Sequence, residues 1–357
     1  MADDKIQSVD AGNPNNTEKK EKKKKNKLTV ILSVLLAIFI VISGGEFLFI
    51  NSYLNKINYG DTVGEVNPDL DKQESVDFEG REGADSEIQE NLNDNTMWYN
   101  SKVYNILLVG VDLGDEEDVM FEGAYLPRSD SMMLLSINSD KNIINLVSLS
   151  RASYVSIPGH GNKRLNTAHA YGGAKLLVQT IEDNYKFKID RYVTVDMSSF
   201  TMVINAIGGV NIDLTAKEAE IVLKKAVAGN YKLNGDQALL YSRIRNIDND
   251  RERTSRQRKV IEAIAAKFRN SSITTLISLV DDILPMVTTN FTKKEIISQA
   301  AKAPSYLSME IKQDIIPHTS YPLTLRDGKE VLILDWKATK LYAHNLLYPG
   351  LQPEKFN

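Results

Sequence analysis

The feature that most constrains this chain is an uncharged apolar run near its N-terminus. Residues 28–45 read LTVILSVLLAIFIVISGG, and after Glu46 the chain continues with the apolar residues FLFI. A run of this length can cross a bilayer as one helix. Because it passes into bulky side chains without the small-residue pattern of a signal-peptide cleavage site, we expect an uncleaved transmembrane helix over residues 28–50.

The charges on either side of this run predict its orientation. Seven lysines lie between residues 19 and 27, whereas the fifty residues after the run contain many carboxylates and only Lys56, Lys72 and Arg81 as bases. A lysine run can also be a solvated or nucleic-acid-binding tail, but its position against an apolar span favours a role in topology. The sequence therefore predicts a cytoplasmic tail (residues 1–27) and a single-pass cell-membrane protein whose remainder is extracellular.

Composition distinguishes two regions, a stalk and a domain, in the part of the chain that we expect outside the cell. Residues 51–98 are rich in Asp, Glu, Gly and Asn, which predicts a flexible acidic stalk. The chain contains no cysteine, so disulfides, iron–sulfur clusters and thiolate catalysis are excluded. The four histidines are not clustered, which argues against a zinc site. One extracytoplasmic catalytic domain, residues 99–357, is expected.

Within residues 99–357, short apolar runs alternate with helical patterns, as is typical of an α/β sandwich. The expected strands cover residues 104–111, 131–137, 143–149, 192–196, 210–214 and 330–335. The expected helices cover residues 173–185, 198–207, 254–268, 273–284, 292–301 and 338–347, with one more that begins after Thr215. Capping boxes mark two helix starts, Thr215 with Glu218 and Thr292 with Glu295. The near-continuous apolarity of the strands predicts a mixed α/β fold, in which helices cover a mainly β-sheet core on both faces.

Charged residues stand where these apolar strands begin and end. Asp112 ends the first strand, Arg128 and Asp130 precede the second, and Arg151 follows the third. Taken singly, each has a simple explanation, as a turn aspartate or a surface ion pair. If the strands are neighbours, however, two carboxylates and two arginines meet at one edge of the sheet. That arrangement suits a hard cation beside an anionic ligand.

An arginine-rich segment, YSRIRNIDNDRERTSRQRK, covers residues 241–259. A solvated basic helix face is the simple alternative, but lysine is nearly absent and two aspartates, Asp248 and Asp250, interrupt the run. Arginine is preferred where phosphate is held by paired hydrogen bonds, and a helix N-terminus also attracts anions. Nucleic acid is a poor fit, because the chain has a net charge of −4 and no aromatic residues interleave the arginines.

Spacing decides which of these arginines can act together. Arg243 and Arg245 are two apart, so they face the same way only if that piece is extended. Arg253 and Arg256 are three apart at the expected start of a helix, and therefore share a helix face.

Several motifs occur in order between residues 104 and 269: NILLVGVD, RSDSMMLLSI, NLVSLSRASYVSIPGHGNKRLNTAHAYGG, GGVNIDL and GDQALLYSRIRNIDNDRERTSRQRKVIEAI. Together with the expected anchor, they resemble the LytR-CpsA-Psr family of Gram-positive bacteria. Members of that family transfer anionic glycopolymers, such as teichoic acids or capsular polysaccharide, from a polyprenyl-pyrophosphate carrier to peptidoglycan. The resemblance implies the same activity and partners here, with an apolar tunnel between sheet and helices for the lipid tail.

The resemblance also implies roles for single residues. Asp112 and Asp130 would hold Mg²⁺ on the pyrophosphate, and Asp250 would be the candidate base for the acceptor hydroxyl, in a catalytic set with Arg128 and Arg253. The side chains expected to grip the pyrophosphate are Arg128, Arg151, Arg164, Arg243, Arg245, Arg253 and Arg256.

Three positions depart from the family pattern. Ala152 stands where an aspartate is usual, Arg164 replaces a lysine, and Glu252 replaces a glycine. The first change removes a carboxylate near the arginines, which could lower metal affinity or rate. Two other functions remain open, a hydrolase that cleaves polyprenyl pyrophosphates with water and a non-catalytic regulator of the cell envelope. A direct transcriptional role is not expected, because the tail has no helix-turn-helix pattern.

Overall fold

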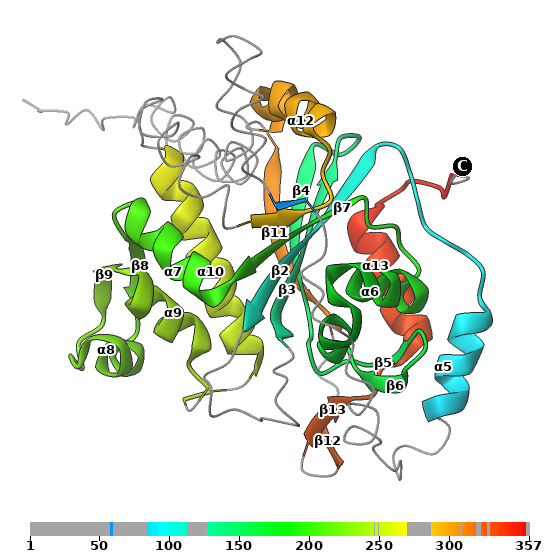
Figure 1. Ribbon diagram of the computed structural model, residues 1–357, viewed down its shortest axis with the longest axis horizontal. Helices are drawn as coiled ribbons and strands as arrows, with labels where there is room; N and C mark the ends of the chain where they lie inside the picture. The colour runs from blue at the N-terminus through cyan, green and yellow to red at the C-terminus, as the bar shows by residue number, and fades with distance from the viewer. Residues whose placement is uncertain are drawn as a thin grey trace, which may run out of the picture.

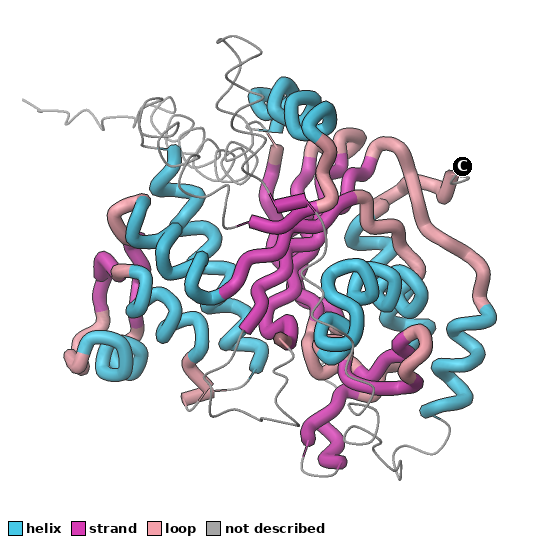
Figure 2. The backbone as a smooth tube through the Cα atoms, in the orientation of Figure 1, coloured by secondary structure: helices cyan, strands magenta, loops and turns pink. Residues whose placement is uncertain are grey.

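A seven-stranded mixed sheet, with strand order β1-β10-β7-β2-β3-β4-β11, organises the structure (Figures 1 and 2). The structure is a computed structural model that describes residues 58–59, 84–112, 127–245, 247–248, 250–269, 287–306, 309–318, 323–326 and 329–354. The central strands are β7 (Arg191–Asp196), β2 (Val103–Asp112), β3 (Arg128–Asn138) and β4 (Ile143–Leu149). The outer strands are β1 (Asn58–Tyr59), β10 (Val287–Thr289) and β11 (Glu310–Ile316). All four expected central strands are therefore confirmed.

Helices cover both faces of this sheet, as the apolar strands predicted (Figure 1). On one face, α6 (Thr167–Tyr185) and α13 (Trp336–Leu347) pack on a cluster that includes Leu107, Leu134 and Val147. On the other face, α7 (Met197–Ala206), α10 (Asp250–Arg269) and α12 (Lys293–Tyr306) contribute to two further clusters. The mixed α/β sandwich is thus confirmed.

Several expected elements form but differ in bounds or partners. The strand at 210–214 is β8 (Val210–Leu214), which pairs with β9 (Gly229–Leu233) beside α8 (Ala216–Leu223) instead of joining the main sheet. The last expected strand is β13 (Lys329–Leu332), which pairs with β12 (Leu323–Arg326) and forms a single bridge from Leu332 to Ser153 instead of joining the main sheet. A third two-stranded unit joins β5 (Tyr154–Ile157) and β6 (Gly161–Arg164). These units lie around the sandwich instead of extending its sheet.

Both capping boxes are confirmed by their hydrogen bonds. The Thr215 N–H donates to Glu218 Oε2 at 2.8 Å, and the Thr292 N–H donates to Glu295 Oε2 at 2.9 Å. The expected helix at 254–268 begins four residues earlier, at Asp250, and the helix expected at 273–284 lies outside the described residues.

The N-terminal predictions have two outcomes. The tail and the anchor at 28–50 lie outside the described residues, and none of the described helices is long and apolar enough to cross a bilayer. The last part of the predicted stalk is wrong, because α5 (Ala84–Asn93) packs on the domain with Ile88 only 3% exposed. The Asn91 side chain also donates to the Asn184 carbonyl oxygen at 2.8 Å. Among the residues from 84 onward, packed structure therefore begins before Trp98.

Candidate functional site

The ends of the central strands bring the predicted polar residues to one edge of the sheet. β3 runs antiparallel between β2 and β4, so its start lies beside the carboxyl ends of both neighbours. Asp112 pairs in register with Arg128, and Arg151 follows β4 by two residues. A β-bulge shifts the register between Gly110 and Val111, and such bulges often occur beside active sites. The predicted meeting of these strand ends is confirmed.

Asp130 is the centre of the charged contacts at this edge. Arg151 Nη1 donates to Asp130 Oδ1 at 3.0 Å, and Arg245 Nη2 lies 3.6 Å from Asp130 Oδ2. Because solvent reaches all three side chains, each pair contributes well under about 1 kcal/mol to stability and is easily exchanged for contacts with a ligand. An expected metal ligand and two expected pyrophosphate ligands therefore already touch one another.

The arginine-rich segment joins α9 (Gly235–Arg243) to α10. Arg243 is the last residue of α9, and Ile244 leaves the helix with φ −56° and ψ 126°. Arg245 is thereby released from the helical spiral, and its side chain extends to Asp130 on β3. Both Arg243 and Arg245 are exposed. The backbone is thus extended at Ile244, whereas Arg243 itself is helical.

The first turn of α10 lies against the end of α9 and carries Arg253, which is 2% exposed. The free N–H groups and the dipole of a helix N-terminus favour an anion there. The side chains of Asp250 and Asp112 lie outside the described part of the chain, so their roles as base and metal ligand stay predictions. Arg128 begins β3 at this edge, and Arg253 lies in the first turn of α10.

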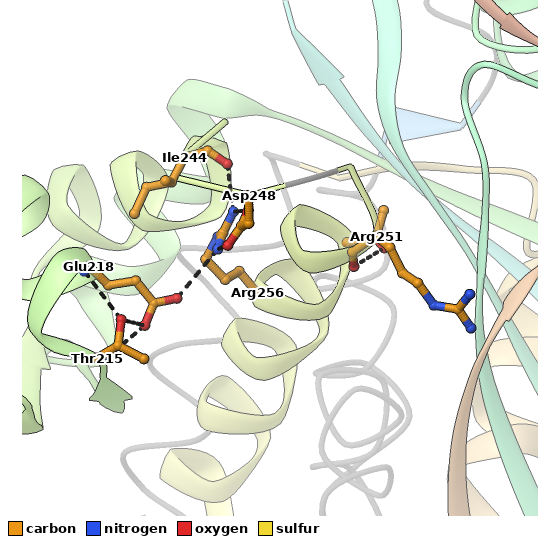
Figure 3. A network of polar contacts seen from close by, with 7 residues as sticks. Thr215, Glu218, Ile244, Asp248, Arg251 and Arg256 are labelled. Carbon is orange, nitrogen blue, oxygen red and sulfur yellow. Dashed lines mark hydrogen bonds and ion pairs between the residues drawn. The ribbon is translucent and has the colours of Figure 1, made fainter. Parts of the chain in front are cut away.

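Arg256 lies one turn further along α10 and is engaged inside the protein (Figure 3). Its Nη1 and Nη2 donate to the two oxygens of Asp248 at 2.6 and 2.7 Å, and Nη2 also donates to the Ile244 carbonyl oxygen at 2.7 Å. Nη1 lies 3.4 Å from Glu218 Oε1. The expectation that Arg256 grips a pyrophosphate is therefore corrected, because its guanidinium is already bonded to Asp248, Glu218 and the Ile244 carbonyl oxygen.

Arg164 reaches the site through the β5–β6 hairpin. It is the last residue of β6, stands opposite Tyr154 and is half-buried. Two residues later, the Asn166 N–H donates to the Arg151 carbonyl oxygen at 3.3 Å. The chain just after Arg164 therefore lies beside Arg151, and the role of Arg164 as a pyrophosphate ligand stays a prediction.

An apolar cavity of about 200 Å³ extends from this edge into the protein, between the sheet and helices α7, α10 and α12. Its walls are largely aliphatic and aromatic, and include Ile106, Leu108, Met133, Leu135, Val193, Val195, Phe200, Val203, Val260, Ile261, Ile264 and Phe291. This cavity lies between sheet and helices, where the resemblance placed a tunnel for the lipid tail, and its occupation by a lipid stays a prediction.

Polar residues line the cavity where it approaches the arginines. Ser242 precedes Arg243, and Gln257 lies four residues after Arg253 on the same side of α10. Sequence reasoning missed Gln257, although its spacing from Arg253 was a usable signal. These two side chains connect the charged edge to the apolar interior.

Asp196, at the end of β7, also lines the cavity but is occupied as a helix cap. Its Oδ1 accepts from the Ser199 N–H at 2.8 Å and from Ser198 Oγ at 2.7 Å. Burial raises the pKa of this carboxyl, but the hydrogen bonds from Ser199 and Ser198 outweigh that and hold the pKa below its ordinary value. Asp196 therefore stays ionised and bound to α7, which makes it a poor base.

The described residues fit Mg²⁺ only in part. Among them, no three His, Asp or Glu side chains are grouped to hold a metal ion, and Asp130 is the predicted ligand whose side chain is described. Mg²⁺ usually takes one or two carboxylates and fills its other positions with water and phosphate oxygens. Two aspartates on adjacent strands would supply that number of carboxylates, and Mg²⁺ binding by Asp112 and Asp130 stays a prediction.

The LytR_cpsA_psr family model matches residues 64–344. The chain belongs to the LytR-CpsA-Psr family. Among curated relatives, the polyisoprenyl-teichoic acid–peptidoglycan teichoic acid transferase TagU of Oceanobacillus iheyensis is 34% identical over 252 residues, which are 68% of this chain and 70% of that protein. The TagU protein of Enterococcus faecalis is 34% identical over 235 residues, 64% of this chain and 74% of that protein.

Solved structures of the LytR-CpsA-Psr family have the same fold. TagT bound to LI-WTA superposes with a TM-score of 0.55 at 26% identity, covering 69% of this chain and 91% of that one. The mixed α/β sandwich described above is therefore the fold of this family.

Proposed function

We propose that this LytR-CpsA-Psr protein transfers an anionic glycopolymer, a teichoic acid or a capsular polysaccharide, from a polyprenyl-pyrophosphate carrier to peptidoglycan. One observation carries the proposal, namely that the lining of the apolar cavity includes Ser131 and Ser242, which adjoin Asp130 and Arg243 in the chain. A lipid pyrophosphate has an apolar tail and a doubly anionic head, and this site offers a matching surface for each. The names of the TagU relatives support the same reaction.

The expected chemistry follows from the side chains at the edge. A peptidoglycan hydroxyl attacks the phosphorus that carries the glycopolymer, and a new phosphodiester bond forms as the bond to the bridging oxygen breaks. The hydroxyl proton passes to Asp250, and the lipid phosphate leaves with the electron pair of the broken bond. Arg128, Arg151, Arg164, Arg243, Arg245 and Arg253 would stabilise the charge on the phosphate oxygens. Arginine keeps its proton at any external pH, so this stabilisation would persist.

Mg²⁺, when bound by Asp112 and Asp130, would add positive charge next to the pyrophosphate. The protein is proposed to act at the outer surface of the cell membrane, held by the predicted helix at residues 28–50. This places the site near a carrier that resides in the bilayer.

The transfer itself is tested with the full chain in detergent micelles, a polyprenyl-pyrophosphate-linked oligosaccharide and soluble peptidoglycan fragments. We expect sugar phosphate attached to peptidoglycan, at a rate that depends on the acceptor. Release of free sugar phosphate at a rate independent of the acceptor would identify the hydrolase instead. Absence of both products under conditions where the lipid binds would favour the regulator.

Binding of Mg²⁺ is expected to depend on the pyrophosphate. Arg151 and Arg245 already neutralise Asp130, so a cation alone must displace them, whereas a pyrophosphate draws the arginines to its own oxygens. Isothermal titration should show Mg²⁺ binding at least tenfold more tightly when a prenyl pyrophosphate is present. Equal affinity in both titrations would contradict this exchange.

A further inference from the structure

An ion network surrounds the buried side chain of Arg256, between α8, α10 and the segment that joins α9 to α10 (Figure 3). Arg256 Nη2 donates to the Ile244 carbonyl oxygen, and both terminal nitrogens bond to Asp248. Ile244 lies between Arg243 and Arg245 in the chain. The guanidinium therefore holds the peptide that separates two arginines of the proposed pyrophosphate site.

Glu218 fixes the other side of this network. Its Oε2 accepts from the Thr215 N–H at 2.8 Å and from Thr215 Oγ1 at 2.9 Å, which closes the capping box of α8. Its Oε1 faces Arg256 Nη1 at 3.4 Å. The Glu218 side chain is only 6% exposed, and the capping box fixes its position. It therefore helps to fix the position of the Arg256 guanidinium.

The positive charge of Arg256 compensates the negative charges of Asp248 and Glu218 in this network. Asp248 and Glu218 are both next to Arg256, whose hydrogen bond holds the pKa of Asp248 below its ordinary value despite partial burial. Without the guanidinium, two carboxylates would face each other next to a buried Ile244 side chain. Arg256 therefore ties both Ile244 and Asp248 to α10.

We propose that Arg256, held by Asp248 and Glu218, fixes the positions of Arg243 and Arg245. By doing so it would increase the affinity of this site for a pyrophosphate group. The inference rests on the proposed function. It differs from a direct contact, because Arg256 reaches the ligand only through the backbone of Ile244. It also differs from simple stabilisation, because the backbone that it holds carries Arg243 and Arg245.

A double-mutant cycle tests the proposal by equilibrium binding of farnesyl pyrophosphate to the full chain in detergent micelles. Asp248→Asn keeps the size of the side chain and removes its charge. In the natural background we expect it to weaken binding about tenfold. In an Arg243→Ala/Arg245→Ala background we expect less than a twofold further loss, because the residues that the network positions are gone. Equal tenfold losses in both backgrounds, or none in the natural one, would overturn the positioning role.

Two further variants separate positioning from folding. Glu218→Gln retains the capping box, in which Glu and Gln are interchangeable, and weakens only the ion pair, so we expect a smaller loss in the same direction. Arg256→Lys should recover part of the affinity lost in Arg256→Met. No difference between those two variants would contradict the need for a cation there.

Arg258→Lys is the matched control on the same helix. Arg258 is also buried, but its guanidinium donates to Ser148 Oγ at 2.7 Å and to Gln313 Oε1 at 3.2 Å, on β4 and β11. We expect a lower melting temperature and unchanged affinity for farnesyl pyrophosphate. A tenfold loss of affinity here would show that any disturbance of α10 suffices, and would overturn the specific role of Arg256.

The cycle also distinguishes failure of this inference from failure of the proposed function. If Arg243→Ala/Arg245→Ala binds farnesyl pyrophosphate as well as the natural protein, the arginine site itself is wrong and the inference falls with it. If that variant binds weakly but the losses add, the site stands and the positioning role alone is overturned.

Discussion

Replacing Arg253 by methionine is expected to lower the rate of glycopolymer transfer about a thousandfold, which is the effect of removing one arginine that stabilises a phosphoryl-transfer transition state. Methionine has a similar length and no charge, and Arg253 is 2% exposed, so the first turn of α10 keeps an apolar filling. The measurement is kcat/KM for the lipid-linked oligosaccharide, with circular dichroism to show that the domain remains folded.

Arg258→Met provides the comparison for that experiment. Arg258 is buried on the same helix but bonds to Ser148 on β4 and to Gln313 on β11, instead of to the segment that joins α9 to α10. Leaving Ser148 and Gln313 without this donor should cost about 1–3 kcal/mol of stability and little activity. If both variants lose transfer to the same extent, the loss in Arg253→Met reflects the packing of α10 and not its charge.

Filling the cavity is expected to have the second largest effect. Leu108 lies on β2, is half-buried and lines the cavity, so tryptophan at this position can extend into the space proposed for the lipid tail. Excluding roughly four methylene groups, at about 0.8 kcal/mol each, should weaken binding of a long polyprenyl pyrophosphate about two hundredfold. Binding of inorganic pyrophosphate should be unchanged, because the arginines are untouched.

Leu341→Trp adds the same side chain elsewhere. Leu341 is 63% exposed on α13, which packs on the opposite face of the sheet. We expect unchanged affinity for both ligands. Should Leu108→Trp bind the long and the short ligand as the natural protein does, the tail does not occupy this cavity.

The central strands could be predicted because each is a near-continuous apolar run, whereas the position of β8 could not be predicted from its apolarity alone. In VNIDL the apolar residues alternate with exposed Asn211 and Asp213. That alternation indicates a sheet covered on one face only, which is how β8 pairs with β9. Strand β11 was missed for a related reason, since EIKQDII is largely polar and forms the edge of the sheet.

The helix α5 was missed because only two of its residues carry the apolar signal. Ile88 and Leu92 are four apart and face the domain, while most of the other side chains are polar. A single apolar pair is too little to distinguish a packed helix from an acidic linker. The packing became visible only with the tertiary structure.

The candidate site shows the same limit. The strand ends were placed correctly from chain order, since antiparallel neighbours bring the end of one strand beside the start of the next. The different roles of Arg253 and Arg256 could not be predicted from the sequence, because both residues lie on one broad side of a helix. What distinguishes them is the presence of Glu218 and Asp248 around Arg256, and Glu218 comes from a helix almost forty residues earlier in the chain.

The walls of the cavity belong to the hydrophobic core itself. Ile106 and Met133 are members of one buried cluster, and Val203 and Val260 of another. A carrier tail bound between them would pack as part of the hydrophobic core for as long as it is bound. Ligands that bind only the native state raise its stability, so resistance to heat and to proteases would rise when the carrier arrives and fall when the lipid phosphate departs. The isoprenoid chain would then affect both the catalytic turnover of the domain and its resistance to unfolding.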